Sequence, residues 1–92
     1  METDMYSVLG NEVRIKLLLA LSHGEKSVSE LILQTGLAQS AVSQHLQKLR
    51  AWDMVFVRSE GREKYYSIAD RDLTMICTLI LQYVNKKSSS IA

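Results

Sequence analysis

A run of serine and glutamine side chains recurs at helical spacing near the middle of the chain. At about 100° per residue, these side chains gather on one side of a helix, opposite its apolar stripe. Glutamine can form two hydrogen bonds with adenine, and serine can bond to the edge of a purine or a pyrimidine. The pattern therefore predicts a helix that reads base edges in the major groove of double-stranded DNA. Its reading side chains are Ser40, Ser43, Gln44 and Gln47, with Gln39 at the helix start.

The charges on this stretch support contact with DNA. Lys48 and Arg50 can bind phosphates, as can the backbone N–H groups at the start of the helix. The alternative is an ordinary solvated helix face. Residues 31–52 contain no Asp or Glu, however, whereas a solvated surface helix usually mixes acidic with basic side chains. The absence of acids favours DNA contact because acids would repel phosphate.

His45 lies at the edge of the apolar stripe of the same helix. One interpretation is a contact to phosphate or base. The other is a half-buried histidine bonded to a neighbouring backbone carbonyl. One ring nitrogen can also point inward while the other points outward, so both interpretations stay open.

Basic side chains surround Gly61, between two runs rich in β-forming residues. This arrangement predicts a hairpin, or wing, whose tip brings arginine near phosphate or into a narrow minor groove. The alternative is an ordinary charged turn, because acids stand beside the bases; we favour the wing. We assign the two adjacent tyrosines to sheet packing rather than base stacking. The basic residues are Arg58, Arg62 and Lys64, the acids Glu60 and Glu63, and the tyrosines Tyr65 and Tyr66.

Helix and turn signals place these residues on a small set of elements. A short piece at 4–9 precedes a helix that Asn11 caps and that ends at Gly24. Ser27 and Glu30 match a capping box for a short helix, and a turn at 35–37 leads into the helix at 39–51. Strands at 55–58 and 64–68 and a final helix at about 71–86 follow. The order predicts a mainly α fold with a β-hairpin: a winged helix-turn-helix.

Length and composition exclude several classes of protein. The chain has 92 residues, which predicts one domain at 1–87 with a disordered tail at 88–92 and leaves little room for a large catalytic cleft. The longest apolar run, residues 17–21, is too short to span a membrane, and no secretory signal is evident. The formal net charge is only +1, but residues 38–64 carry five basic and three acidic side chains. We expect a cytoplasmic protein.

Four segments together resemble the ArsR/SmtB family of winged-helix repressors. They are residues 9–14 (LGNEVR), 27–31 (SVSEL), 39–46 (QSAVSQHL) and 60–67 (EGREKYYS). The resemblance covers about residues 8–84. It implies a homodimeric repressor on palindromic operators that dimerises through its first and last helices. The apolar stripe of the last helix agrees with this dimerisation, because a domain this small can hardly bury the stripe by itself. The expected interface residues are Met5, Val8, Leu9, Leu73, Ile76, Cys77, Ile80 and Val84.

The sequence departs from the family at the positions that sense inducers. Ile32 and Gln34 stand where many metal-sensing members carry a cysteine pair. Of the Asp, His, His and Glu that form another family site on the last helix, only Asp70 has a match. The other positions hold Asp72, Tyr83 and Lys86. We therefore expect no metal, no cofactor and an inducer of unknown nature, or none.

Two smaller departures affect the ends of the 39–51 helix. Ala38 lies where the family usually has a serine N-cap, which costs about 1 kcal/mol of local stability. Asp53 stands where glycine is common before the first strand, and aspartate tolerates left-handed geometry better than most residues. We expect the turn at Asp53 to survive.

Cys77 is the only cysteine, so neither an intrachain disulfide nor a CxxC site can form. We interpret it as a small buried hydrophobe, and a disulfide to Cys77 of a second subunit is the alternative. Two other functions compete with a DNA-binding repressor: a winged-helix module that binds proteins, and an enzyme. We expect no enzyme, because His23, His45 and Cys77 form no recognisable catalytic arrangement.

Overall fold

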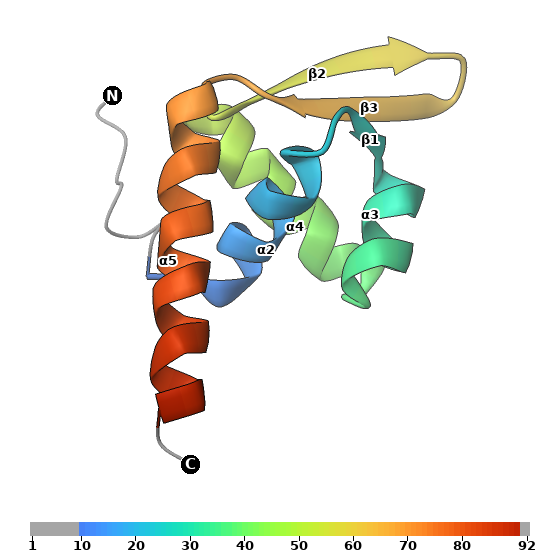
Figure 1. The fold of residues 1–92 in the computed structure, drawn as a ribbon. Helices are drawn as coiled ribbons and strands as arrows, with labels where there is room; N and C mark the ends of the chain where they lie inside the picture. The colour runs from blue at the N-terminus through green and yellow to red at the C-terminus, as the bar shows by residue number, and fades with distance from the viewer. Residues whose placement is uncertain (1–9, 91–92) are drawn as a thin grey trace.

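The computed structural model describes residues 10–90, and it places three shorter helices and a hairpin beside one long helix (Figure 1). The element order is α2 (Glu12–Leu21), β1 (Lys26–Ser27), α3 (Val28–Thr35), α4 (Gln39–Ala51), β2 (Val55–Glu60), β3 (Glu63–Ile68) and α5 (Arg71–Ser90). The expected piece at 4–9 lies outside the described residues. None of the described helices is long and apolar enough to cross a membrane.

The caps predicted from the sequence form at the starts of α2 and α3. The Asn11 side chain accepts a hydrogen bond from the Arg14 backbone N–H at 3.1 Å. Ser27 and Glu30 form the full capping box, with N–O distances of 3.0 and 3.1 Å. Gly36 ends α3 in the left-handed conformation with a φ of 72°. These signals fix α3 and the turn that aims α4.

The two ends of α4 differ in how they are capped. Ala38 provides no side-chain hydrogen bond at the start, as predicted. At the other end, the Met54 N–H bonds to the Leu49 carbonyl at 2.9 Å, and the Asp53 N–H bonds to the Arg50 carbonyl at 3.0 Å. This pair of bonds is a Schellman motif, with Asp53 as its left-handed residue at a φ of 58°. The tolerance expected of aspartate is confirmed.

The sheet has three antiparallel strands in the order β1-β3-β2. Only Gly61 and Arg62 connect β2 to β3, and Gly61 has a φ of 61°, which suits the first position of a two-residue hairpin loop. Both hairpin strands are longer than predicted. β1 was not predicted at all, because two residues show no periodicity that a sequence can reveal.

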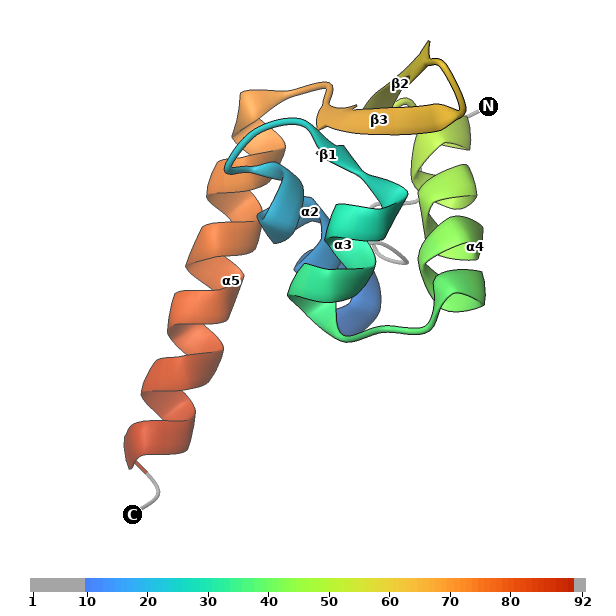
Figure 2. The ribbon, with the colours of Figure 1, turned by 90° about the vertical axis from the view of Figure 1, so that its right-hand side faces the viewer.

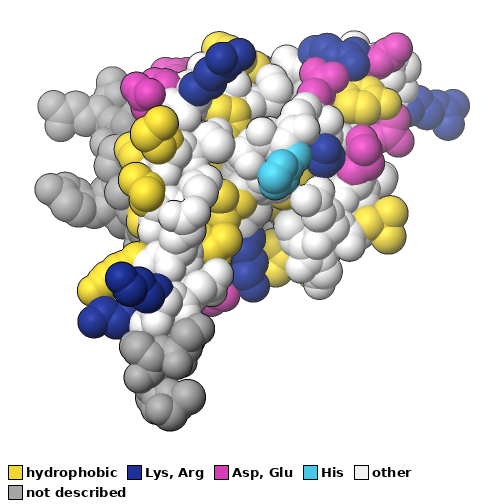
Figure 3. Space-filling model, viewed as in Figure 1, with side chains coloured by type: hydrophobic (Ala, Val, Ile, Leu, Met, Phe, Trp, Pro, Cys, Tyr) yellow, Lys and Arg dark blue, Asp and Glu magenta, His cyan; other side chains and the backbone are white. Residues whose placement is uncertain are grey.

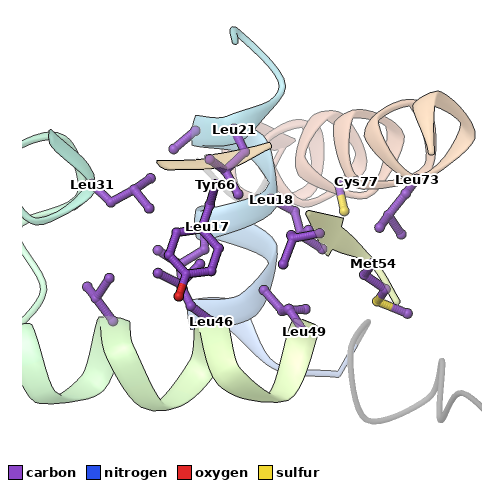
Figure 4. Packing of buried hydrophobic residues seen from close by; sticks show 13 residues of the cluster. Leu17, Leu18, Leu21, Leu31, Leu46, Leu49, Met54, Tyr66, Leu73 and Cys77 are labelled. Carbon is purple, nitrogen blue, oxygen red and sulfur yellow. The ribbon is translucent and has the colours of Figure 1, made fainter. Parts of the chain in front are cut away.

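The core lies where α2, α4, the base of the sheet and α5 meet (Figure 4). Tyr66 is inward on β3, whereas its neighbour Tyr65 is only half-buried, which agrees with their assignment to sheet packing. α5 continues to Ser90, so the helix extends past the predicted boundary at 87 and the expected tail is helical at 88–90. The core residues are Leu17, Leu18, Ala20, Leu21, Leu31, Val42, Leu46, Leu49, Met54, Val55, Tyr66, Leu73 and Cys77.

Candidate nucleic-acid interface

The helix α4 divides into a packed face and an open face. Val42, Leu46 and Leu49 are fully buried against the core. The polar side chains predicted to read bases point the other way, and all are exposed except Ser43, which is half-buried. The exposed residues are Gln39, Ser40, Gln44, Gln47, Lys48 and Arg50. Because α4 carries no acidic side chain, its open face combines hydrogen-bonding groups with positive charge.

His45 lies between these two faces and is held from behind by a buried arginine. The Arg14 Nε–H on α2 donates to Nδ1 of His45 at 3.3 Å, and Arg14 also lies over the Trp52 ring, 5.0 Å from its centroid. The histidine is half-buried, as one interpretation had it. That interpretation was wrong about the partner, which is the Arg14 side chain rather than a backbone carbonyl.

Burial and nearby charges favour the neutral form of His45, and the contact with Arg14 selects the ring nitrogen that carries its proton. Burial lowers the pKa of its imidazole, and the nearby charges of Arg14 and Lys48 lower it further. Since Nδ1 accepts from Arg14, the proton of the neutral ring belongs on Nε2. The ring therefore has a donor available for a second partner such as a phosphate or base oxygen.

Arg14 was not predicted, although the sequence held a signal for it. It occupies the position that precedes Leu17, Leu18 and Leu21 at helical spacing, so it belongs to the apolar side of α2. With only 8% of its surface exposed, it is the most deeply buried charged residue of the described chain. A buried arginine is expected to have partners, and His45 is one of them.

The tip of the hairpin carries the second basic surface. Arg62 and Lys64 are exposed, and within residues 10–90 neither forms an ion pair. The hairpin projects away from α5, and Figure 3 shows acidic and basic side chains gathered over it at the upper right. Both side chains are therefore available to phosphates, together with the acids Glu60 and Glu63 beside them.

Arg58 is placed differently from the other two basic residues of the wing. Its guanidinium donates to both carboxylate oxygens of Glu25, at 2.8–3.0 Å, and to Glu60 at 2.8 Å. It also lies over the Tyr65 ring, 4.6 Å from the centroid. The hydrogen bonds to Glu25 and Glu60 raise its pKa above the ordinary value for arginine. Its predicted role as a DNA contact thus competes with partners inside the chain.

The helix α5 has two apolar sides. Leu73 and Cys77 point into the chain's own core toward Met54, as Figure 4 shows, and they are 6% and 0% exposed. This differs from the expectation that both face a second subunit. Burial also raises the pKa of the Cys77 thiol. Ile80 is half-buried.

The outer side of α5 is more apolar than predicted. Ile76, expected at an interface, is exposed there, and further large hydrophobic side chains join it. Val84, also expected at an interface, is exposed on the other side, where it lines a hollow with Ile15 and Leu19 of α2. Figure 3 shows apolar side chains along α5 at the left of that view. Met5, Val8 and Leu9 lie outside the described residues. The additional exposed side chains on the outer side are Met75, Leu79 and Tyr83.

The two surfaces are separated in space. Figure 2 shows α4 and α5 on opposite sides of the molecule, and Figure 1 shows the hairpin tip pointing away from α5. Between residues 10 and 90, no group of three or more His, Cys, Asp or Glu side chains is arranged to hold a metal ion. The molecule thus presents a polar, basic surface and an apolar one, each on its own elements.

Comparison with known proteins gives the family. The profile described as "Bacterial regulatory protein, arsR family" matches residues 11–55. The nodulation protein NolR of Rhizobium meliloti is 43% identical over 61 residues, which are 66% of this chain and 50% of NolR. The transcriptional activator HlyU of Vibrio cholerae is 33% identical over 76 residues, which are 83% of this chain and 70% of HlyU.

Solved structures show the same fold. Reduced HlyU from Vibrio cholerae matches with a TM-score of 0.75 and 32% identity, over 86% of this chain and 83% of that one. The transcriptional repressor BigR from Xylella fastidiosa matches with a TM-score of 0.79 and 28% identity, over 86% of this chain and 81% of that one.

The chain is shorter than several curated relatives. Its matches with three of them span only 37–51% of each relative's length. The structural matches are nevertheless winged-helix regulators, of which this chain covers 81–83%. These relatives are transcriptional regulators rather than enzymes. The chain belongs to the ArsR family of bacterial regulatory proteins.

Proposed function

We propose that this chain is a sequence-specific DNA-binding regulator that acts as a homodimeric repressor on a palindromic operator. The observation that carries the proposal is the open face of α4. Its serine and glutamine side chains are exposed apart from the half-buried Ser43, no acid interrupts them, and the opposite face packs against the core. Side chains of this type can discriminate base edges once the helix enters the major groove.

The wing adds the electrostatic part of the proposed interface. Arg62 and Lys64 stand at the tip of a hairpin that follows α4 directly, so they are suited to bind the backbone or the minor groove beside the bound major groove. Lys48 and Arg50 add phosphate contacts on α4. Affinity for DNA should therefore fall steeply as salt concentration rises.

A second copy of the chain is the proposed occupant of the outer side of α5. Exposed apolar side chains recur there at Met75, Leu79 and Tyr83, one helical turn apart, and Ile76 lies beside them. A contiguous apolar stripe of this kind usually marks an interface. A two-fold dimer would present two α4 helices to successive major grooves, about 34 Å apart.

The direction of regulation is part of the proposal. Relatives of this chain include a protein described as a transcriptional activator and others described as repressors. We infer repression, because a compact winged-helix dimer can block a promoter simply by occupying it. The regulator would lack the family's cysteine-pair site, since Ile32 and Gln34 stand at those positions. We propose no metal or cofactor, and leave the inducer open.

The test is selection of binding sites from a random pool of duplex DNA, followed by footprinting of the enriched site. We expect a dyad-symmetric consensus, protection on both half-sites, and loss of protection with Gln44→Ala. Arg62→Gln should weaken binding to all sequences, whereas the matched change Arg71→Gln, at the start of α5, should not. Failure to enrich any sequence would contradict the proposal and favour a winged-helix module that binds proteins. A promoter reporter then distinguishes repression from activation.

A further inference from the structure

The hairpin β2–β3 has a three-stranded base and a two-stranded tip. β1 pairs with β3 only at Tyr66 and Tyr65. The next two pairs of the hairpin, Ser59 with Lys64 and Glu60 with Glu63, have no third strand beside them. An isolated two-stranded hairpin is only marginally stable in water. The direction of the tip therefore depends on the contacts made where the base ends.

Arg58 lies at that boundary. It pairs with Tyr65, which is the residue nearest the tip among those of β3 that also pair with β1. From the edge strand β2, its side chain passes over the Tyr65 ring of β3 and reaches Glu25, which precedes β1 at the opposite edge of the sheet. It donates three hydrogen bonds of 2.8–3.0 Å to Glu25 and one of 2.8 Å to Glu60. We call this set of contacts the Arg58 bridge.

The geometry of the bridge makes it more than a chance surface pair. A single exposed ion pair contributes little, because both side chains lose freedom and water screens the charges. In the bridge, the planar guanidinium binds one carboxylate through two nitrogens, stacks on an aromatic ring and binds a second carboxylate. Its Nε, Nη1 and Nη2 atoms each donate within the chain, so a phosphate would compete with two carboxylates for this guanidinium.

We propose that Arg58 is a positioning residue for the wing: through Glu25 it fixes the direction of the tip, so that Arg62 and Lys64 reach the DNA. The inference rests on the proposed function, and it replaces the expectation that Arg58 itself contacts DNA. Glu25 becomes a residue needed for DNA binding although it is acidic.

Substitution of Glu25 separates the two roles by the sign of the effect. Glu25→Gln removes a negative charge and frees the guanidinium. If Arg58 contacted phosphate, binding would tighten. If Arg58 positions the wing, binding should weaken roughly fivefold, as after the loss of a phosphate contact. Glu63→Gln is the matched control, since it removes the same charge from a tip residue that forms no ion pair within the described chain; its binding should hold or tighten.

If Arg58 positions the wing, the effect of Glu25→Gln on DNA affinity should require the basic side chains of the tip. A general loss of stability would have no such requirement. In the double variant Arg62→Gln/Lys64→Gln, the further change Glu25→Gln should cause no further loss of affinity, because the misdirected tip no longer has basic side chains to lose. A destabilised fold would lower affinity in both backgrounds. Arg58→Lys keeps the charge but cannot form the planar fork, so it should behave like Glu25→Gln.

A measurement without DNA completes the test. The NMR order parameter of the Gly61 amide should fall in Glu25→Gln and Arg58→Lys and stay unchanged in Glu63→Gln. An unchanged Gly61 order parameter, or tighter DNA binding by Glu25→Gln, would overturn the inference. If the wild-type chain bound no DNA at all, the proposed function would fail, and the Gly61 result would still decide whether the bridge holds the tip.

Discussion

Arg14 on α2 donates a hydrogen bond from Nε to Nδ1 of His45 on α4, 3.3 Å away. The two residues are 31 positions apart, so the bond joins the helix beside α5 directly to the helix that carries the predicted base-reading side chains. Arg14 also stacks on Trp52, the C-cap residue of α4. A single buried guanidinium thus contacts both the middle and the end of α4.

The lowered pKa of His45 predicts that acid destabilises the fold. Between the lowered pKa of His45 and the ordinary histidine value of about 6.5, the folded chain binds fewer protons than the unfolded chain. The contribution is complete above that pH and is lost as the pH falls through the lowered pKa. His45→Asn, which keeps an acceptor near Arg14, should reduce the drop in unfolding free energy between pH 7.5 and 5.5. Identical pH profiles of the two proteins by urea denaturation would refute this.

The left-handed residue at the end of α4 predicts a stabilising substitution. Asp53 has a φ of 58° and stands at the negative end of the helix. Asp53→Gly should raise the free energy of unfolding by about 1 kcal/mol, because glycine adopts this conformation without a steric penalty. Asp53→Asn, which removes only the charge, should give a smaller gain. Thermal and chemical denaturation at pH 7 measure both; a loss of stability in Asp53→Gly would show that the carboxylate has an unrecognised stabilising role.

The outer side of α5 predicts a variant that separates folding from dimerisation. Leu79 is 59% exposed in the single chain, so Leu79→Lys should leave the fold intact. A lysine in an apolar interface should weaken the dimer by at least about tenfold. Leu33→Lys is the control, since Leu33 is a more exposed leucine that lies on α3. Sedimentation velocity at micromolar concentration measures the effect, and an unchanged dimer in Leu79→Lys would place the interface elsewhere.

The burial of Cys77 predicts a thiol that does not react in the folded chain. No part of the residue is exposed, and burial raises the pKa of its thiol, so little thiolate forms at neutral pH. Mild oxidant should leave a monomer band on a non-reducing gel, and a thiol reagent should label Cys77 only after denaturation. A reducible covalent dimer would instead support the alternative of a Cys77 disulfide between subunits.

Sequence reasoning succeeded where the cause of a structure is local. Asn11, the Ser27 and Glu30 pair and Gly36 each act within a few residues, so type and spacing were enough to predict the helix ends. The alternation of side chains predicted the hairpin in the same way. The third strand was missed because β1 forms only by pairing with β3, about 40 positions later in the chain.

Contacts between distant residues limited the prediction of the site. The periodicity of α5 revealed an apolar helix but not which of its sides faces the core, so Leu73 and Cys77 were assigned to an interface that the structure turns inward. The roles of Arg14 and Arg58 depend on His45 and Glu25, more than 30 positions away in each case. Nothing in the local sequence of either arginine identifies its partner.

The short reach of β1 has a consequence for the solubility of the chain. Beyond Tyr65, β3 has an uncovered edge with backbone groups that another chain's strand can pair with, which is how aggregation often begins. The residues along that stretch are Glu63 and Lys64, both charged and exposed. Charged side chains on a bare strand edge disfavour the addition of a foreign strand. The same tip that is proposed to bind DNA thus also disfavours aggregation of the folded chain through strand pairing.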